Sequence, residues 1–117
     1  MNQQLAILDV EFLNTIIDDD IEFRNELFVI FKDSSNANLQ KMIKSLESED
    51  FSMWYAASHA FKGAASSIGA FALASILEQA QRSVDKNRQE RELILADVQQ
   101  CYGNLLKVLE KIETDQL

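Results

Sequence analysis

The sequence predicts an all-α protein, an antiparallel up-down four-helix bundle with an additional short helix at its N-terminus. Three observations predict this class. The 117 residues include no proline and only three glycines, so few positions would interrupt a helix. Apolar residues recur at intervals of three and four along most of the chain, with no sustained alternation and no Asn-Gly or Asp-Gly hairpin signal. Short polar connections between these segments make successive helices run in opposite directions.

Two helices are expected in the first part of the chain, over residues 5–17 and from about residue 20 to about residue 47. The first has Leu5, Leu8, Phe12, Leu13 and Ile16 at helical spacing, and the second has Leu27, Phe28, Phe31, Leu39, Met42, Ile43 and Leu46. The aspartates at 18–20 are expected to supply the N-cap and first-turn acids of the second helix. They lack the ligand spacing of a calcium loop. A polar stretch at residues 34–38 is a candidate position for a bend.

The third helix is expected after a short connection at residues 49–51, with Ser52 as its N-cap and Gly69 as the left-handed residue that ends it. At ~100° per residue, one face gathers Ser52, Tyr55, His59, Lys62, Gly63 and Ser66. The opposite, apolar arc gathers Met53, Trp54, Ala57, Ala60, Phe61, Ala64 and Ile68. The helix is therefore predicted to pack by one side and to present the only histidine of the chain on the other.

Two more helices are expected in the remaining chain. The fourth has an apolar stripe of Leu73, Ile76, Leu77, Ala80 and Val84 and a polar side of Glu78, Gln79, Arg82 and Asp85. Residues 86–90 are the most polar part and indicate a turn. The last helix, from about residue 91 to about residue 113, is expected to bury Ile94, Val98, Cys101, Leu105, Leu109 and Ile112. Cys101 has no second cysteine and no partners at metal-ligand spacing, so it is expected to be a buried apolar filler.

The composition fits one domain over residues 1–117, because 47% of the residues are hydrophobic and a chain of this length can bury its own core. The net charge of −8 weighs against nucleic acid and anionic membranes as partners, since both attract basic proteins. No apolar run approaches the ~20 residues of a membrane span, and no signal segment opens the chain. A cytoplasmic location is therefore expected, and the initiating Met1 favours a free-standing protein.

His59 carries the strongest functional signal. Lys62, at i+3, can reach a group on the imidazole. Gly63, at i+4, costs ~1 kcal/mol relative to alanine within a helix, which indicates that bare backbone beside the histidine has a use. A neutral imidazole nitrogen is a competent nucleophile near neutral pH, and phosphoryl transfer asks a protein mainly for positioning and charge stabilisation. Lys62 could supply the charge and Ser66 a hydrogen-bond donor, so the pattern predicts phosphoryl transfer through a phosphohistidine on Nε2.

The stretch His59-Ala60-Phe61-Lys62-Gly63, followed by small residues and Gly69, resembles the signature of histidine-containing phosphotransfer (HPt) domains. In that family a lysine follows the histidine at three, a glycine follows at four, and a glycine at ten ends the helix. This sequence matches each of these places. The resemblance covers most of the chain. It also implies that a glutamine on the next helix, Gln81 in this sequence, holds the histidine ring by its Nδ1.

The sequence departs from the family pattern at three places. Phe61 stands where leucine is usual, and Leu77 stands where a cysteine is often found. Some members have an arginine near the site on the fourth helix, whereas the equivalent place here is closer to Asp85, with Arg82 as the nearby substitute. The first is expected to be a tolerable core change, and only the third departure bears on whether the site has a second cation.

The resemblance implies a phosphorelay intermediate, in which His59 accepts a phosphoryl group from a receiver-domain aspartate and passes it to the aspartate of another response regulator. The implied partners are receiver domains and a hybrid sensor histidine kinase, and the receiver is expected to bring the Mg²⁺, so no cofactor or metal site is expected in this chain. Lys62 would neutralise the phosphoryl oxygens and Gln81 would fix the ring. Docking is expected around His59, at Tyr55, Ala56, Gly63 and Ser66. A monomer is expected, because one bundle would use the apolar residues of the second helix.

Other interpretations stay open. A non-catalytic helical bundle could bind a partner protein and merely expose His59. Replacing His59 by glutamine separates the two, since phosphoryl labelling is lost under the first and partner function is untouched under the second. A domain that docks without reacting is disfavoured because His59 and Lys62 are both present. An autonomous enzyme is least favoured, because the sequence has no Walker-type loop for ATP and no second histidine, carboxylate pair or nucleophile-and-base pair.

Overall fold

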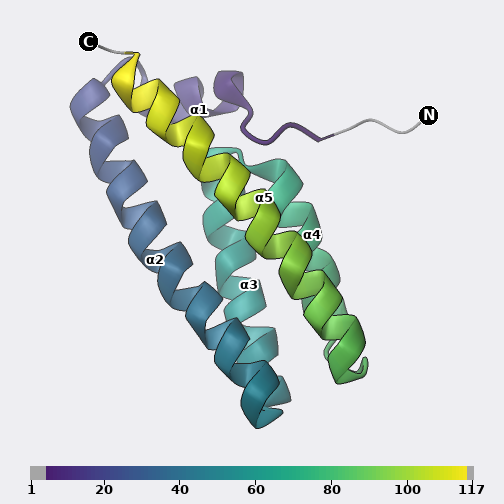
Figure 1. Ribbon diagram of the computed structural model, residues 1–117. Coiled ribbons are helices and arrows are strands. Elements are labelled where there is room, and N and C mark those ends of the chain that lie inside the picture. Colours follow the sequence, from purple (N-terminus) through teal and green to yellow (C-terminus); the bar gives the residue numbers. More distant parts are fainter. Residues whose placement is uncertain (1–4, 116–117) are drawn as a thin grey trace.

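The computed structural model describes residues 5–115, and within them the chain forms five helices and no strand. They are α1 (Val10–Ile17), α2 (Ile21–Ser48), α3 (Phe51–Ile68), α4 (Phe71–Arg82) and α5 (Arg88–Thr114). The four longer helices run lengthwise and alternate in direction, and α1 lies at the end of the bundle where α5 ends (Figure 1). The predicted fold class, an up-down four-helix bundle with an additional short N-terminal helix, is confirmed.

The core places α3 between α2 and α4, while α5 closes the bundle against the same two helices. Large side chains from all four fill the interior, among them Phe28, Trp54, Phe61, Leu77 and Leu105, each with 0% of its surface exposed. The Phe61 ring meets the Tyr102 ring edge-on at 5.4 Å between centroids. The Trp54 indole N–H donates to the carbonyl of Ala80 at 2.7 Å. This buried bond fixes the register of α3 against α4, on which the site depends.

The N-terminal helix is shorter than predicted. α1 begins at Val10, and the Asp9 side chain accepts from the Phe12 N–H at 3.0 Å as its N-cap. Residues 5–9 are not helical because their backbone groups pair with another part of the chain. The Asp9 N–H donates to the Gly69 carbonyl at 2.9 Å, and the Ala72 N–H donates to the Ala6 carbonyl at 3.1 Å. This segment therefore lies across the turn between α3 and α4 and is hydrogen-bonded to it.

Only one of the aspartates at 18–20 has the role predicted for them. Only Asp20 caps α2, through the Phe23 N–H at 2.9 Å. Asp18 ends α1 in a left-handed conformation, with φ 48°, and Asp19 also has positive φ. Neither is a first-turn acid. α2 is a continuous helix from residue 21 to residue 48, so the polar stretch at 34–38 does not interrupt it.

The third helix starts earlier than predicted and ends as predicted. Asp50, not Ser52, is the N-cap, and its side chain accepts from the Met53 N–H at 3.0 Å. Ser52 is instead the second helical residue. Gly69 ends α3 with φ 90°, and a Cβ at this position would lie 3.1 Å from the Asp9 carbonyl oxygen. Glycine is thus required here both by the left-handed backbone and by the close approach of the segment at residues 5–9.

The last connection is also shifted. α4 ends at Arg82, so Val84 lies beyond it, and α5 begins at Arg88 after the N-cap Asn87. The turn is therefore at residues 83–87, not 86–90. Cys101 is half-buried at the edge of the core, not fully buried, and that burial raises the pKa of its thiol. The α5 residues that are buried are Arg91, Leu95, Val98, Tyr102, Leu105 and Leu109.

One premise about the second helix is wrong. Val29 and Ile30 of α2 are 56% and 65% exposed, so one bundle does not use all of its apolar residues. The monomeric state itself stays a prediction. Among residues 5–115, no helix combines the length and the hydropathy that crossing a bilayer requires.

Candidate functional site

His59 lies in the middle of α3, and its side chain is exposed. Its neighbours Ser58 and Phe61 are buried, because they fall on the core face of the helix. The helical period then turns residue 59 outward, beside the line along which α3 packs on α4. Two helices can therefore supply groups to the imidazole: α3 through residues one turn away, and α4 from across the helix interface.

A hydrogen-bonded chain holds the imidazole from α4. Gln81 Oε1 lies 3.3 Å from His59 Nδ1, and the Gln81 amide nitrogen donates to the Tyr55 hydroxyl oxygen at 3.1 Å. Because the amide N–H₂ is used toward Tyr55, the amide oxygen faces the imidazole and can only accept. Nδ1 then carries the ring proton, and Nε2 keeps its lone pair. The arrangement thus leaves the exposed nitrogen free to act as a nucleophile.

Tyr55 was predicted only as a docking contact, but in the structure it also helps to position the groups around His59. Its ring is stacked on the imidazole from one turn earlier in α3, with centroids 6.2 Å apart and planes at 3°. Tyr55 therefore lies parallel to the imidazole and also orients the amide of Gln81. The side chain is 45% exposed, so it could still meet a partner.

Lys62 is already paired with a carboxylate. Its ammonium donates to Glu78 Oε2 on α4 at 2.7 Å, and the other carboxylate oxygen of Glu78 forms an ion pair with Arg82 Nε at 3.0 Å. The hydrogen bond from Lys62 is the main reason that the pKa of Glu78 is lowered from 4.5. Arg82 is the more solvated partner, with 78% of its side chain exposed against 26% for Lys62.

Two pairs of side chains meet across the interface of α3 and α4, and we call His59, Lys62, Glu78 and Gln81 the site quartet. His59 and Lys62 are three residues apart on α3, as are Glu78 and Gln81 on α4, which makes each pair neighbours on a helix surface. The cross-helix contacts join His59 to Gln81 and Lys62 to Glu78. The quartet brings one nucleophile, one cation and one anion together.

The other side of His59 is lined by small residues. A Cβ added at Gly63 would meet nothing within 4 Å. Ala56 and Ala60 are exposed, although Ala60 was expected to pack on the apolar side. Ser66 is half-buried further along α3, and within residues 5–115 no hydrogen bond joins its hydroxyl to the imidazole. Bare backbone and methyl groups therefore surround this side of the histidine.

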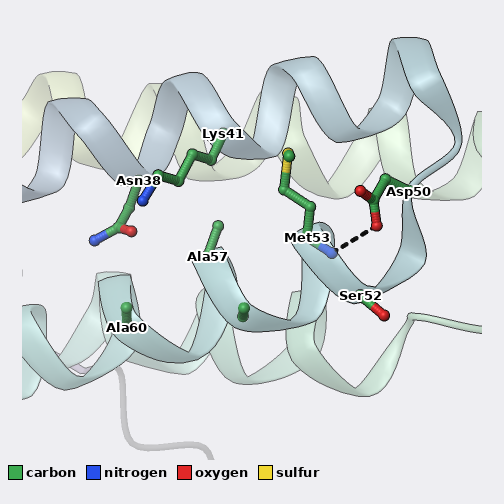
Figure 2. Close-up of a pocket in the computed structure, with 8 residues that line it drawn as sticks. Asn38, Lys41, Asp50, Ser52, Met53, Ala57 and Ala60 are labelled. Atoms are coloured by element: carbon green, nitrogen blue, oxygen red, sulfur yellow. Dashed lines mark hydrogen bonds between the residues drawn. The ribbon is translucent and has the colours of Figure 1, made fainter.

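A groove of about 580 Å³ continues this small-residue surface between α2 and α3. Figure 2 shows Asn38 and Lys41 of α2 facing Met53, Ala57 and Ala60 of α3 across it. We call it the α2–α3 groove. It is lined by Asn38, Lys41, Asp50, Ser52, Met53, Ala56, Ala57 and Ala60. The hollow lies beside His59 without including it, which suits the seating of another molecule next to the imidazole better than the enclosure of a substrate.

Sequence reasoning placed most of these residues but missed one. Glu78 was recognised only as part of the polar side of the fourth helix, and its i, i+4 spacing to Arg82 was the available signal. Leu77, at the place where the family often has cysteine, is fully buried in the core. Asp85 lies in the turn after α4, so it does not occupy a place on the helix beside His59. Arg82 is on the helix, and Glu78 engages it.

No group of three His, Cys, Asp or Glu side chains able to hold a metal ion occurs in the part of the chain that the structure describes. The aspartates at 18–20 serve as caps and turn residues instead. The groups present at the site are therefore an imidazole, two cations, a carboxylate and an amide.

Comparisons with known proteins agree with this picture. Residues 26–114 match the family model of the Hpt domain. The fold is similar to that of the crystal structure of histidine-containing phosphotransfer protein B (HptB) from Pseudomonas aeruginosa PAO1, with a TM-score of 0.83 and 18% identity over 96% of this chain and 98% of that chain. No curated protein matches the chain significantly. The structural likeness shows a common fold, and because the family model matches most of the sequence, the chain belongs to the Hpt domain family.

Proposed function

We propose that this chain is a phosphorelay intermediate, in which His59 accepts a phosphoryl group from an aspartyl phosphate of a receiver domain and passes it to the aspartate of another response regulator. Membership of the Hpt family supports a phosphotransfer role in a phosphorelay. The observation that carries the proposal is the contact of 3.3 Å between His59 Nδ1 and Gln81 Oε1. It leaves Nε2 exposed with its lone pair available.

The transfer step follows from this geometry. The Nε2 lone pair attacks phosphorus, an N–P bond forms, and the P–O bond of the acyl phosphate breaks, so that the aspartate carboxylate leaves with the electron pair. The imidazole becomes positively charged when it takes the phosphoryl group, and its Nδ1–H donates to the Gln81 oxygen, which stabilises that charge. In the next step an acceptor carboxylate attacks phosphorus, and the N–P electron pair returns to Nε2.

The remaining catalytic groups would come from both proteins. Lys62 lies one turn from His59 and would approach the phosphoryl oxygens as they arrive, with Ser66 as a further donor along α3. The receiver domain would bring Mg²⁺, which neutralises phosphoryl charge in such transfers. The chain's own part is thus to hold the nucleophile and to supply one cation.

The docking face would combine the surroundings of His59 with the α2–α3 groove. Gly63 and Ala56 leave room for the close approach that in-line attack on phosphorus needs. Tyr55 and Ser66 would border the contact on the α4 side. The exposed methyl groups of Ala56 and Ala60 and the apolar part of the groove offer a surface that loses little side-chain entropy on binding. The proposed partners are receiver domains and a hybrid sensor histidine kinase, met by a monomer, a role that would place the chain in the cytoplasm.

The test is transfer of phosphoryl from a phosphorylated receiver domain in the presence of Mg²⁺, followed by phosphorus NMR. We expect a base-stable, acid-labile phosphohistidine in the wild type and none in His59→Gln, with circular dichroism and thermal unfolding unchanged by the substitution. If several receivers bind and none delivers phosphoryl, the alternative of a docking-only helical bundle replaces the proposal. Labelling that persists in His59→Gln would place the chemistry at another residue.

A further inference from the structure

We propose that Glu78 is a positioning residue that destabilises the phosphorylated form of His59 relative to the phosphorylated receiver, and that Arg82 reduces this effect. The inference rests on the proposed function, because it concerns the equilibrium between a phosphorylated receiver and phosphorylated His59. Within residues 5–115, no hydrogen bond or ion pair joins Glu78 to the imidazole, and its polar partners are Lys62 and Arg82. Glu78 acts through Lys62, the cation nearest the histidine along α3.

The site quartet links the carboxylate of Glu78 to the surroundings of His59 through Lys62. Lys62 Nζ lies 2.7 Å from Glu78 Oε2, and Gln81 Oε1 lies 3.3 Å from His59 Nδ1. Within each helix the paired residues are neighbours, with ~5–6 Å between their Cβ atoms. A phosphoryl group on His59 would therefore lie on the helix face that His59 shares with Lys62, and Lys62 is already paired with Glu78. The phosphoryl group must share the cation with a carboxylate that already holds it.

Charge then decides the direction of the effect. Phosphorylated His59 is more negative overall than the neutral imidazole, because the dianionic phosphoryl group outweighs the positive charge on the ring. Glu78 therefore disfavours the phosphorylated form by repulsion and by partly neutralising Lys62. Arg82 engages the second carboxylate oxygen of Glu78 at 3.0 Å and offsets part of that repulsion. Together Lys62, Glu78 and Arg82 sum to a single positive charge. Removing Glu78 raises this sum to two, and removing Arg82 lowers it to zero.

Such an arrangement suits a phosphocarrier, which must pass on the phosphoryl group that it accepts. A site with two unopposed cations would hold the phosphoryl group on His59 and slow its passage to the acceptor. A site whose cation is already paired leaves the N–P bond ready to be broken by the next carboxylate. The carboxylate is thus proposed to set the balance between loading and release, in the transfer step whose bonds are given above.

The experiment measures the equilibrium constant for transfer from a phosphorylated receiver domain to His59, with Mg²⁺ present, by phosphorus NMR. Glu78→Gln keeps an oxygen for Lys62 but removes the charge, and it should shift the equilibrium toward phosphohistidine ~3- to 10-fold. Arg82→Gln should shift it in the opposite direction by a similar or smaller factor. Both shifts should shrink at 1 M salt, where screening is stronger.

Glu92→Gln is a matched control, because Glu92 accepts from Arg88 Nε on α5 at 3.0 Å with the same i, i+4 spacing. It changes the net charge of the chain by the same amount away from the site quartet, and it should leave the equilibrium unchanged. Glu78→Asp, which restores the charge, should return the equilibrium toward the wild-type value.

Three results would overturn the inference. In the first, Glu78→Gln behaves as Glu92→Gln does. In the second, Glu78→Gln favours the receiver, which would mean that Glu78 chiefly preorganises Lys62. In the third, the Glu78 and Arg82 variants shift the equilibrium in the same direction. Absence of phosphohistidine in the wild type with every receiver tested is a different outcome, since it would overturn the proposed function and this inference with it.

Discussion

The two sides of His59 are built in opposite ways. Toward α4, a hydrogen bond joins the imidazole to the Gln81 oxygen, and an ion pair joins Lys62 to Glu78. Toward α2 there is the α2–α3 groove, lined near the histidine by alanine methyl groups. Within residues 5–115, no side-chain hydrogen bond or ion pair joins α2 to α3. One side of the histidine is therefore held by its own protein, and the other is left bare.

This difference separates two requirements that conflict. A nucleophile must be positioned, which needs contacts, and it must be reached by a second protein, which needs their absence. Placing the contacts on one helix interface and the bare surface on the other satisfies both on a single helix, α3. Substitutions on the α4 side should therefore alter the chemistry of transfer. Substitutions on the side that faces α2 should alter how closely the partner protein can approach His59.

The largest effect is expected where the bare side is filled. Gly63→Gln places a side chain one turn from His59, where a Cβ meets nothing within 4 Å, so the fold should accept it. Replacing a mid-helix glycine should even raise the free energy of unfolding by ~0.5–1 kcal/mol. Transfer from a phosphorylated receiver should slow ~100-fold, because in-line approach is sensitive to displacements of about 1 Å. Rapid-quench kinetics and thermal unfolding measure the two effects.

Gly103→Gln is the matched control for this change. Gly103 is also a mid-helix glycine where an added Cβ would meet nothing within 4 Å, but it lies on α5. It should give a similar gain in stability with transfer unchanged. Unimpaired transfer in Gly63→Gln would show that the partner does not approach over this part of α3.

A smaller effect on the rate of transfer is expected when a contact on the α4 side of His59 is removed. Gln81→Ala removes the acceptor of the His59 Nδ1–H, and transfer should slow ~2- to 10-fold, the size of one net hydrogen bond. Tyr55→Phe keeps the stacked ring and removes only the hydroxyl that orients Gln81, so it should slow transfer less. Gln79→Ala, at an exposed position of the same helix, should have no effect. A Tyr55→Phe variant slower than Gln81→Ala would mean that the hydroxyl acts independently of Gln81.

Much of the fold could be predicted because helical periodicity is a local property of the sequence. The ends of helices were harder. Asp50 and Ser52 are both good N-caps, and which one caps α3 depends on the left-handed turn at Glu49, with φ 54°. The non-helical conformation of residues 5–9 depends on hydrogen bonds to Gly69 and Ala72, far along the sequence. Such long-range pairing leaves no periodic signal.

The same distinction applies to the candidate site. His59, Lys62 and Gly63 lie on one helix, so their shared face follows from the helical period alone. Gln81 was placed by its family resemblance, and the structure brings it to the imidazole. The pairing of Lys62 with Glu78 could not be predicted, because it depends on the register between α3 and α4. That register is set by buried contacts such as the bond from Trp54 to the Ala80 carbonyl.

The smallest expected effect tests whether the ion pair on the held side persists in solution. Lys62→Ala removes the main cause of the lowered pKa of Glu78, so that pKa should rise toward 4.5, while Arg82 keeps part of the lowering. A lowered carboxyl pKa gives stability that is present above the unfolded-state pKa and is lost as pH falls through the folded-state pKa. Lys62→Ala should therefore lose less stability on acidification than the wild type. Carboxyl-carbon NMR titration measures the shift, with Lys44→Ala, an exposed lysine of α2, as the control. An unchanged Glu78 pKa in Lys62→Ala would mean that Lys62 is free in solution, and the contrast between the two sides of His59 would then rest on Gln81 and Tyr55 alone.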